Sequence, residues 1–129
     1  MEDKLIEVLS KLNYPVFRQG SLLPHQPYPR HFFTFWNDSA DGNSFYDNDE
    51  NSITWAYSVN FYSVNPAYTY EKLTEIKSLL KENGFIVTGG GYDVASDEPT
   101  HTGRGISVFY KEIKEVKEWK YLNIEVFVA

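Results

Sequence analysis

The chain has 129 residues, of which 42% are hydrophobic and 17% aromatic, and its formal net charge is −6. The length favours a single domain over residues 1–129, and the composition excludes a disordered chain. Because cysteine is absent, disulfides, thiolate zinc sites and a cysteine nucleophile are excluded, and the acidic balance argues against binding to nucleic-acid phosphates.

Apolar side chains recur at helical spacing near the N-terminus, which predicts an amphipathic helix over residues 2–13. They are Leu5, Val8, Leu9 and Leu12. The first residues carry both charge signs and no sustained apolar run, so we expect neither a secretory signal nor a membrane span.

The next segments predict a short strand, a loop and a longer strand. Residues 16–20 suit an edge strand or an extended lead-in, and the prolines within residues 24–29 predict a loop. Residues 30–37 are aromatic and β-branched, which is the composition of a strand.

An acidic stretch separates this strand from the next one. Residues 38–52 are rich in Asp, Asn and Gly, so we predict a long connection there. Residues 53–61 alternate apolar and polar side chains, which predicts a strand with one buried face. The two strands form an antiparallel pair, and a connection of this length is more often functional or mobile than a short one.

The second half of the chain repeats the order of helix and strands. A helix is predicted over residues 66–83, and a strand over residues 85–94 that consecutive glycines interrupt with a bulge. A polar loop over residues 95–105 leads to a strand that starts at Ile106, and residues 118–129 suit a further C-terminal strand. The order predicts an α+β fold, an antiparallel sheet of about four to six strands with two helices packed on one face.

Residues that commonly carry chemistry are scattered. The histidines are far apart and show no metal-ligand spacing. His101 shares a loop with Asp97 and Arg104, which could orient an imidazole, but the same residues suit a hydrogen-bonded turn. Residues 47–51 resemble the start of a calcium loop, yet the glycine and glutamate that such a loop needs later are missing. We therefore expect no catalytic residue, metal or cofactor.

Aromatic side chains exceed what one buried sheet face can hold. They are Phe32, Phe33, Phe35, Trp36, Trp55, Tyr57, Phe61 and Tyr62. Some of them lie at an interface with another chain, or a second layer such as the tail or the proline-rich loop covers them. A third possibility is that bases or sugars stack on them, which the net charge of −6 disfavours for nucleic acid.

Four segments carry a family resemblance: residues 13–21 (NYPVFRQGS), 28–36 (YPRHFFTFW), 44–48 (SFYDN) and 97–105 (DEPTHTGRG). Together they resemble small structural proteins of long-tailed phages and prophages of Gram-positive bacteria, with tail-completion or tail-terminator proteins as the closest functional counterpart. The resemblance spans residues 1–111. It implies a non-enzymatic virion tail protein, present in the bacterial cytoplasm during assembly, that forms a ring, typically a hexamer. The implied partners are copies of itself, the tail tube protein and a head-completion protein, with no membrane and no specific nucleic acid.

On this reading residues 38–52 project toward the tube or a neighbouring subunit, and an acidic lumen lets DNA pass. The expected contact residues are Phe33, Phe35, Trp36, Phe45, Tyr46, Asp47, Asp49, Trp55, Asp97, His101 and Arg104. Three alternatives stay open: a minor tail or head-completion protein, a small enzyme or ligand-binding domain centred on His101, and a regulatory module that binds a host protein.

Overall fold

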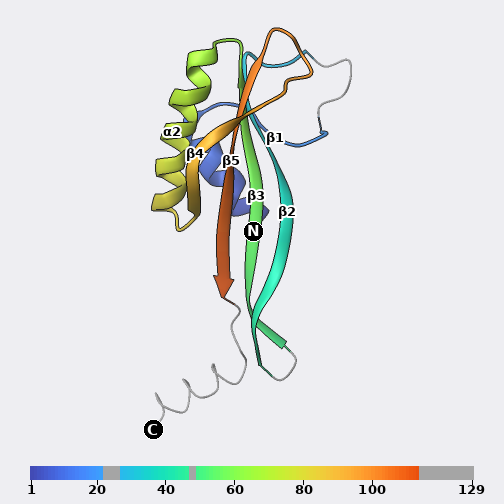
Figure 1. The fold of residues 1–129 in the computed structure, drawn as a ribbon, viewed down its shortest axis with the longest axis vertical. Coiled ribbons are helices and arrows are strands. Elements are labelled where there is room, and N and C mark those ends of the chain that lie inside the picture. The colour runs from blue at the N-terminus through green and yellow to red at the C-terminus, as the bar shows by residue number, and fades with distance from the viewer. Residues whose placement is uncertain (22–26, 47–48, 114–129) are drawn as a thin grey trace.

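The computed structural model of the chain describes residues 1–21, 27–46 and 49–113. The elements in chain order are α1 (Glu2–Leu9), the 3-10 helix η1 (Ser10–Leu12), β1 (Val16–Arg18), β2 (His31–Tyr46), β3 (Asp49–Ser63), α2 (Pro66–Glu82), β4 (Ile86–Val94) and β5 (Thr102–Ile113). Figure 1 shows β2 and β3 paired along the long axis of the molecule, with the helices beside only part of their length.

The strands form one five-stranded sheet in the order β1-β2-β3-β5-β4. This confirms the α+β class, but the sheet is mixed because β1 pairs with β2 in parallel, whereas every other pair is antiparallel. Residues 19–30 supply a crossover between β1 and β2, and a parallel pair needs a connection of about this length. The expectation of a wholly antiparallel sheet is therefore wrong at this edge.

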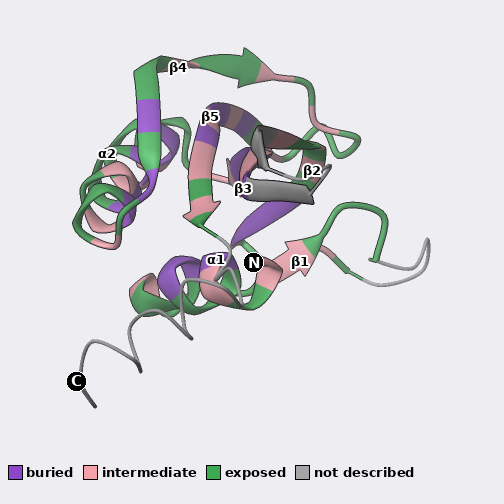
Figure 2. Ribbon diagram, turned by 90° about the horizontal axis from the view of Figure 1, so that it is seen from below, coloured by how far each residue is buried: buried purple, intermediate pink, exposed green. Residues whose placement is uncertain are grey.

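Both helices cover the same face of the sheet, as predicted. Alternation in the strands turns every second side chain toward them, and Figure 2 shows the buried residues of α1 and α2 on the sides that face the sheet. The core includes Leu5, Val8 and Leu9 of α1, Leu73, Ile76 and Leu80 of α2, and Phe33, Phe35, Tyr57, Val59, Phe61, Ile106 and Val108 of the strands.

The predicted helix boundaries are close to the observed ones. The N-terminal helix continues as η1 until Asn13, whose left-handed φ of 63° ends it. Asn65 caps α2 by accepting a hydrogen bond from the Ala67 backbone N–H at 3.1 Å.

Residues 38–52 do not form the long connection that their composition predicts. The ladder between β2 and β3 runs from His31↔Ser63 to Tyr46↔Asp49, with one register shift between Asn37 and Ser39. Strand preference depends strongly on neighbours, so cross-strand pairing outweighs the local preference of Asp, Asn and Gly for turns.

In β4 and β5 the observed bulge and strand boundaries can be compared with the predicted ones. The bulge predicted at the glycines lies between Thr88 and Tyr92, and β5 begins at Thr102, four residues earlier than Ile106. The predicted loop therefore ends at His101. The C-terminal strand expected over residues 118–129 lies outside the described residues.

Candidate functional site

The helix-facing aromatic residues are internal. Phe33 and Phe35 are 0% and 1% exposed, because both occupy the β2 positions that face the helices. Trp55 is half-buried and packs against the same core. Phe33 and Phe35 are thus not accessible to a partner, and the expectation that they lie at a subunit contact is wrong.

The opposite, open face of the sheet holds a second aromatic cluster. Phe32, only 1% exposed, stacks on Tyr62 at 5.2 Å between ring centroids, and Tyr28 meets it edge-on at 5.4 Å. Phe17 and His101 pack on Phe32 at 5.9 Å each. Tyr28, which precedes β2, and His101 of the loop before β5 therefore cover this part of the open face from within the chain.

Trp36 lies further along the same face and is 36% exposed. Its indole N–H donates to Asp38 Oδ1 at 2.6 Å, and Asp38 Oδ2 accepts from Ser58 Oγ at 2.7 Å. The indole is held in place while part of it stays open to solvent, which leaves Trp36 as an expected contact residue that another chain can reach.

The long β2–β3 pair forms a projection that we call the distal ribbon, residues 40–46 and 49–55. Figure 1 shows it extending beyond both helices. Within the described residues, β1 pairs with β2 only as far as Phe35, and β5 pairs with β3 only as far as Ser52. Among residues 1–21, 27–46 and 49–113, the tip of the ribbon is thus two-stranded, and no strand in these ranges pairs with the outer edge of β2 there.

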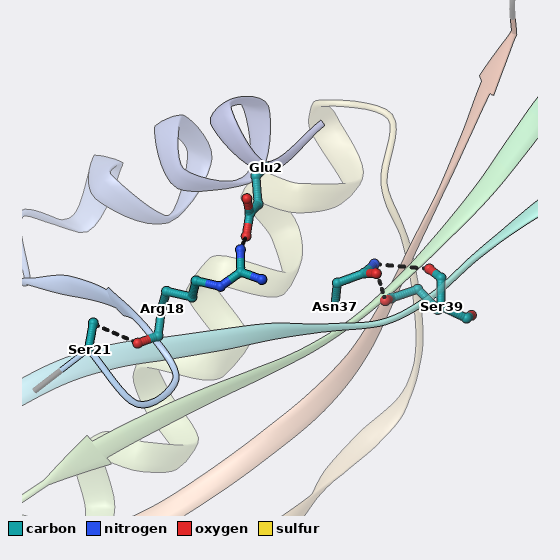
Figure 3. A network of polar contacts seen from close by, with 6 residues as sticks. Glu2, Arg18, Ser21, Asn37 and Ser39 are labelled. Carbon is teal, nitrogen blue, oxygen red and sulfur yellow. Dashed lines mark hydrogen bonds and ion pairs between the residues drawn. The ribbon is translucent and has the colours of Figure 1, made fainter.

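Where the distal ribbon leaves the body, a β-bulge is stabilised by one side chain. Asn37 Nδ2 donates to the Ser39 carbonyl at 2.9 Å and to the Ala56 carbonyl at 3.1 Å, as Figure 3 shows for Ser39. A bulge increases local twist and re-aims the strand beyond it. Asn37 therefore helps to set the direction of the distal ribbon. The sequence did not indicate this role, because Asn is also a common residue in turns.

The structure describes only some of the contact residues expected around the turn between β2 and β3. The backbones of Phe45 and Tyr46 belong to β2, opposite Glu50 and Asp49 of β3. Asp47 lies outside the described residues.

The loop before β5 does not assemble the group expected around His101. The ring Nε2 of His101 donates to the Pro29 carbonyl at 2.8 Å, and Nδ1 lies 2.9 Å from Thr100 Oγ1. Both ring nitrogens are engaged, so His101 ties this loop to the proline-rich loop. The structure thus supports the turn-forming alternative for this histidine.

Arg104 lies on the other side of the sheet from His101. Its guanidinium bonds Asp93 Oδ1 at 2.9 Å and the Gly90 carbonyl at 3.1 Å, and it stacks over Tyr70 of α2 at 4.4 Å. Alternation along β5 places Arg104 on the helix face. Arg104 and Asp97 are therefore not neighbours in space although they are close in the sequence. Asp97 lies near Tyr28 and Tyr62 on the open face.

Among the described residues, no group of three or more His, Asp or Glu side chains is placed to hold a metal ion. No helix in the described part of the chain is long and apolar enough to cross a membrane. Neither the comparison with protein-family models nor that with curated proteins gives a match to this sequence.

Proposed function

We propose that this protein is a non-enzymatic structural subunit of a phage tail, which completes the tail at the head–tail junction by assembling with copies of itself into a ring. The observation that carries the proposal is the distal ribbon, which extends past the helices on two long paired strands. The resemblance of residues 1–111 to tail-completion proteins supplies the biological setting.

A two-stranded ribbon is only marginally stable by itself in water. An unpaired strand edge also presents free backbone donors and acceptors to any neighbouring chain. Packing of the ribbon on another subunit or on the tail tube would stabilise it and supply hydrogen-bond partners for its backbone.

The opposite edge of the sheet offers a different surface. Ile86 and Tyr92 of the edge strand β4 are 56% and 42% exposed. A contact between two different surfaces of identical subunits is heterologous, and such contacts close into a ring when the rotation allows it. We propose that the ribbon of one subunit reaches this side of the next.

The charge of the chain suits a ring through which DNA passes. With a formal net charge of −6, the subunit as a whole repels phosphates. The tail tube protein and a head-completion protein are the proposed partners on either side of the ring.

Shortening the distal ribbon tests the proposal. Replacing residues 44–51 by Asn-Gly retains the Asn43↔Ser52 pair and supplies a two-residue hairpin turn. We expect the variant to fold, since the described core residues all lie outside the replaced segment, but to lose ring formation on the tube. A variant with Lys81→Ala and Glu82→Ala, at the exposed end of α2, is the control and should assemble normally.

The readout is electron microscopy of particles made with each variant and without the protein. Tails of uncontrolled length, or tails detached from heads, are expected in its absence and with the shortened ribbon. Tails that end normally but lack another component would place the protein among minor tail or head-completion proteins. Normal infectious particles without the protein would refute the structural role.

A further inference from the structure

A pocket on the open face of the sheet has the composition of a binding site. It has a volume of about 180 Å³ and is bounded by β1, β2, β3 and the loops that cover this face. Its lining includes Phe17, Tyr28, Phe32, Thr34, Tyr62 and Asp97. No feature of the distal ribbon contributes to it, so its role is separate from the proposed assembly contact.

Four aromatic rings form one side of a pocket whose remaining lining is largely polar. Phe32 contacts the other three rings, with centroid distances of 5.2 Å to Tyr62, 5.4 Å to Tyr28 and 5.9 Å to Phe17. This mutual packing fixes the rings in place. Ring faces attract cations through their quadrupole, most strongly where water is excluded.

The floor beneath the rings carries buried hydrogen-bonding groups that are poorly satisfied. Thr34 and Asn60 are opposite each other in the β2–β3 ladder and are 6% and 1% exposed. Within the described part of the chain, Thr34 Oγ1 and the polar atoms of the Asn60 amide make no hydrogen bond of good geometry, although the Tyr62 phenol lies close enough to interact with both side chains. Leaving such groups unsatisfied is costly, and oxygen acceptors of this kind suit an N–H donor.

The potential at the pocket is negative. Burial raises the pKa of Tyr28, and the carboxylates of Asp97 and Glu98 raise it further. Burial also raises the pKa of Tyr62, with Asp97 adding to the effect while the nearby Thr34 and Asn60 side chains oppose it. Both directions agree with the pocket lining, in which Asp97 lies with Tyr28 and Tyr62.

The cation in the lining is directed away from this negative region. Arg18 contributes to the pocket wall, but its guanidinium pairs with Glu2 of α1, as Figure 3 shows. Arg18 is opposite Phe35 in the ladder, so its side chain lies on the helix face. Asp97, an exposed residue of the lining, is therefore not neutralised by an ion pair with Arg18.

We propose that this pocket binds a primary ammonium group on a short alkyl stem, as carried by a lysine side chain or a small free amine. The aromatic wall packs against the stem and the ammonium, the Asp97 carboxylate supplies the counter-charge, and Thr34 Oγ1 accepts a hydrogen bond from the ammonium. A volume of about 180 Å³ is large enough to admit a butylammonium group.

The test titrates n-butylammonium chloride into the ¹⁵N-labelled full chain and follows the backbone amide signals by NMR. We expect saturable shifts centred on Phe17, Thr34 and Tyr62, and no equivalent shifts with 1-butanol, which has the same stem without charge. Equal binding of 1-butanol, or no saturation at about 100 mM amine, would overturn the proposal.

Two matched acidic variants probe the counter-charge. Asp97→Asn should weaken amine binding about fivefold, the typical effect of one exposed ion pair or cation–π contact. Asp93→Asn removes another exposed carboxylate, on β4, which pairs with Arg104 of β5, and it should leave the affinity unchanged. If the two variants behave alike, Asp97 does not bind the ammonium group.

Thr34→Val distinguishes an effect of the Thr34 hydroxyl on amine binding from its effect on the stability of the fold. Valine has the same shape without the hydroxyl, so a buried and poorly satisfied polar group disappears, and the urea midpoint of unfolding should stay the same or rise. Amine affinity should fall in the same variant. Unchanged affinity would contradict the assigned role of Thr34.

N-acetyl-lysine methylamide distinguishes the two sources of the ammonium group. Binding comparable to that of n-butylammonium supports a lysine from a partner protein, whose backbone must reach the mouth of the pocket. If only the free amine binds, the proposal holds with a small amine as ligand. Loss of assembly in the shortened-ribbon variant leaves this titration unaffected, so the two proposals fail independently.

Discussion

Two glycines of β5 show how one residue can depend on a neighbouring strand. A Cβ added at Gly103 would lie 2.6 Å from Tyr62 Cε1, and one added at Gly105 would lie 2.2 Å from Asn60 Oδ1 and 2.8 Å from Tyr92 Cε2. The rings thus pack directly over glycine backbone, which replaces the side-chain packing that glycine itself lacks.

Gly105→Ala should therefore lower the free energy of unfolding by about 1–3 kcal/mol, because the enclosed Asn60 side chain and the Tyr92 ring must both move. Urea denaturation followed by circular dichroism measures the change. Gly90→Ala is the control, since a Cβ there has no neighbour within 4 Å. Equal stability of the two variants would contradict the close packing over Gly105.

His31 is a second residue whose behaviour is set by its surroundings. Its Nδ1 lies 2.7 Å from Ser63 Oγ, and its ring packs on Tyr68 at 4.9 Å between centroids. Burial lowers its pKa below the ordinary value of 6.5, and the nearby positive charges of Arg30 and Lys72 and the His101 ring add to this effect. The folded protein therefore keeps His31 neutral to a lower pH than the unfolded chain does.

As pH falls through 6.5, the unfolded state takes up a proton at His31 before the folded state, so the free energy of unfolding should decrease. Above this pH the residue is neutral in both states and has no such effect. His31→Gln should flatten the dependence between pH 5 and pH 7, measured by urea denaturation at each pH in parallel with the wild type. A slope unchanged by the substitution would show that other groups cause it.

At the level of elements, α2 illustrates a boundary encoded by local sequence. Asn65 caps the helix, Pro66 occupies its first position, and Gly84 with a φ of 87° follows its end. Each of these roles depends on residues within one turn, which is why the predicted range of 66–83 agrees with the structure.

Asn65→Ala should cost about 1 kcal/mol of stability, because the Ala67 N–H loses its hydrogen-bond acceptor. Thr74→Ala, at an exposed position inside the same helix, is the matched control and should be neutral or slightly stabilising. Thermal denaturation of both variants checks the difference, and a control as unstable as the cap variant would refute the assignment.

The distal ribbon illustrates the opposite case among elements. Its residues have turn-forming composition, yet β2 and β3 continue through them to Tyr46↔Asp49. Pairing with a strand on the other side of the hairpin and a bulge held by Asn37 decide the outcome. Local sequence contains no signal for either contact.

For the whole molecule, the two helices share one core on one face of the sheet. Leu9 of α1 and Ile76 of α2 are both 0% exposed, and both belong to the same buried cluster. A shared core favours a single cooperative unfolding transition in a domain of this size.

Leu9→Ala and Ile76→Ala should each lower the free energy of unfolding by about 2–5 kcal/mol, and helical signal and tryptophan fluorescence should still change together. Ile6→Ala, at a position 36% exposed, is the control and should have a much smaller effect. Loss of α1 alone in Leu9→Ala, before the sheet unfolds, would show that the helix is an independent unit.

By itself the sequence determined the α+β class, both helices, the buried face of the strand at residues 53–61 and the bulge in β4. These features follow from periodicities and capping groups within a few residues of one another, so local physics suffices.

Only the tertiary structure decided the parallel pairing of β1, the length of the distal ribbon, and the opposite sides of the sheet taken by His101 and Arg104. It also decided that Tyr28 packs on Phe32 and that Thr34 and Asn60 lie opposite each other near Tyr62. Each of these depends on contacts between segments distant in the chain, whose energies no local pattern records.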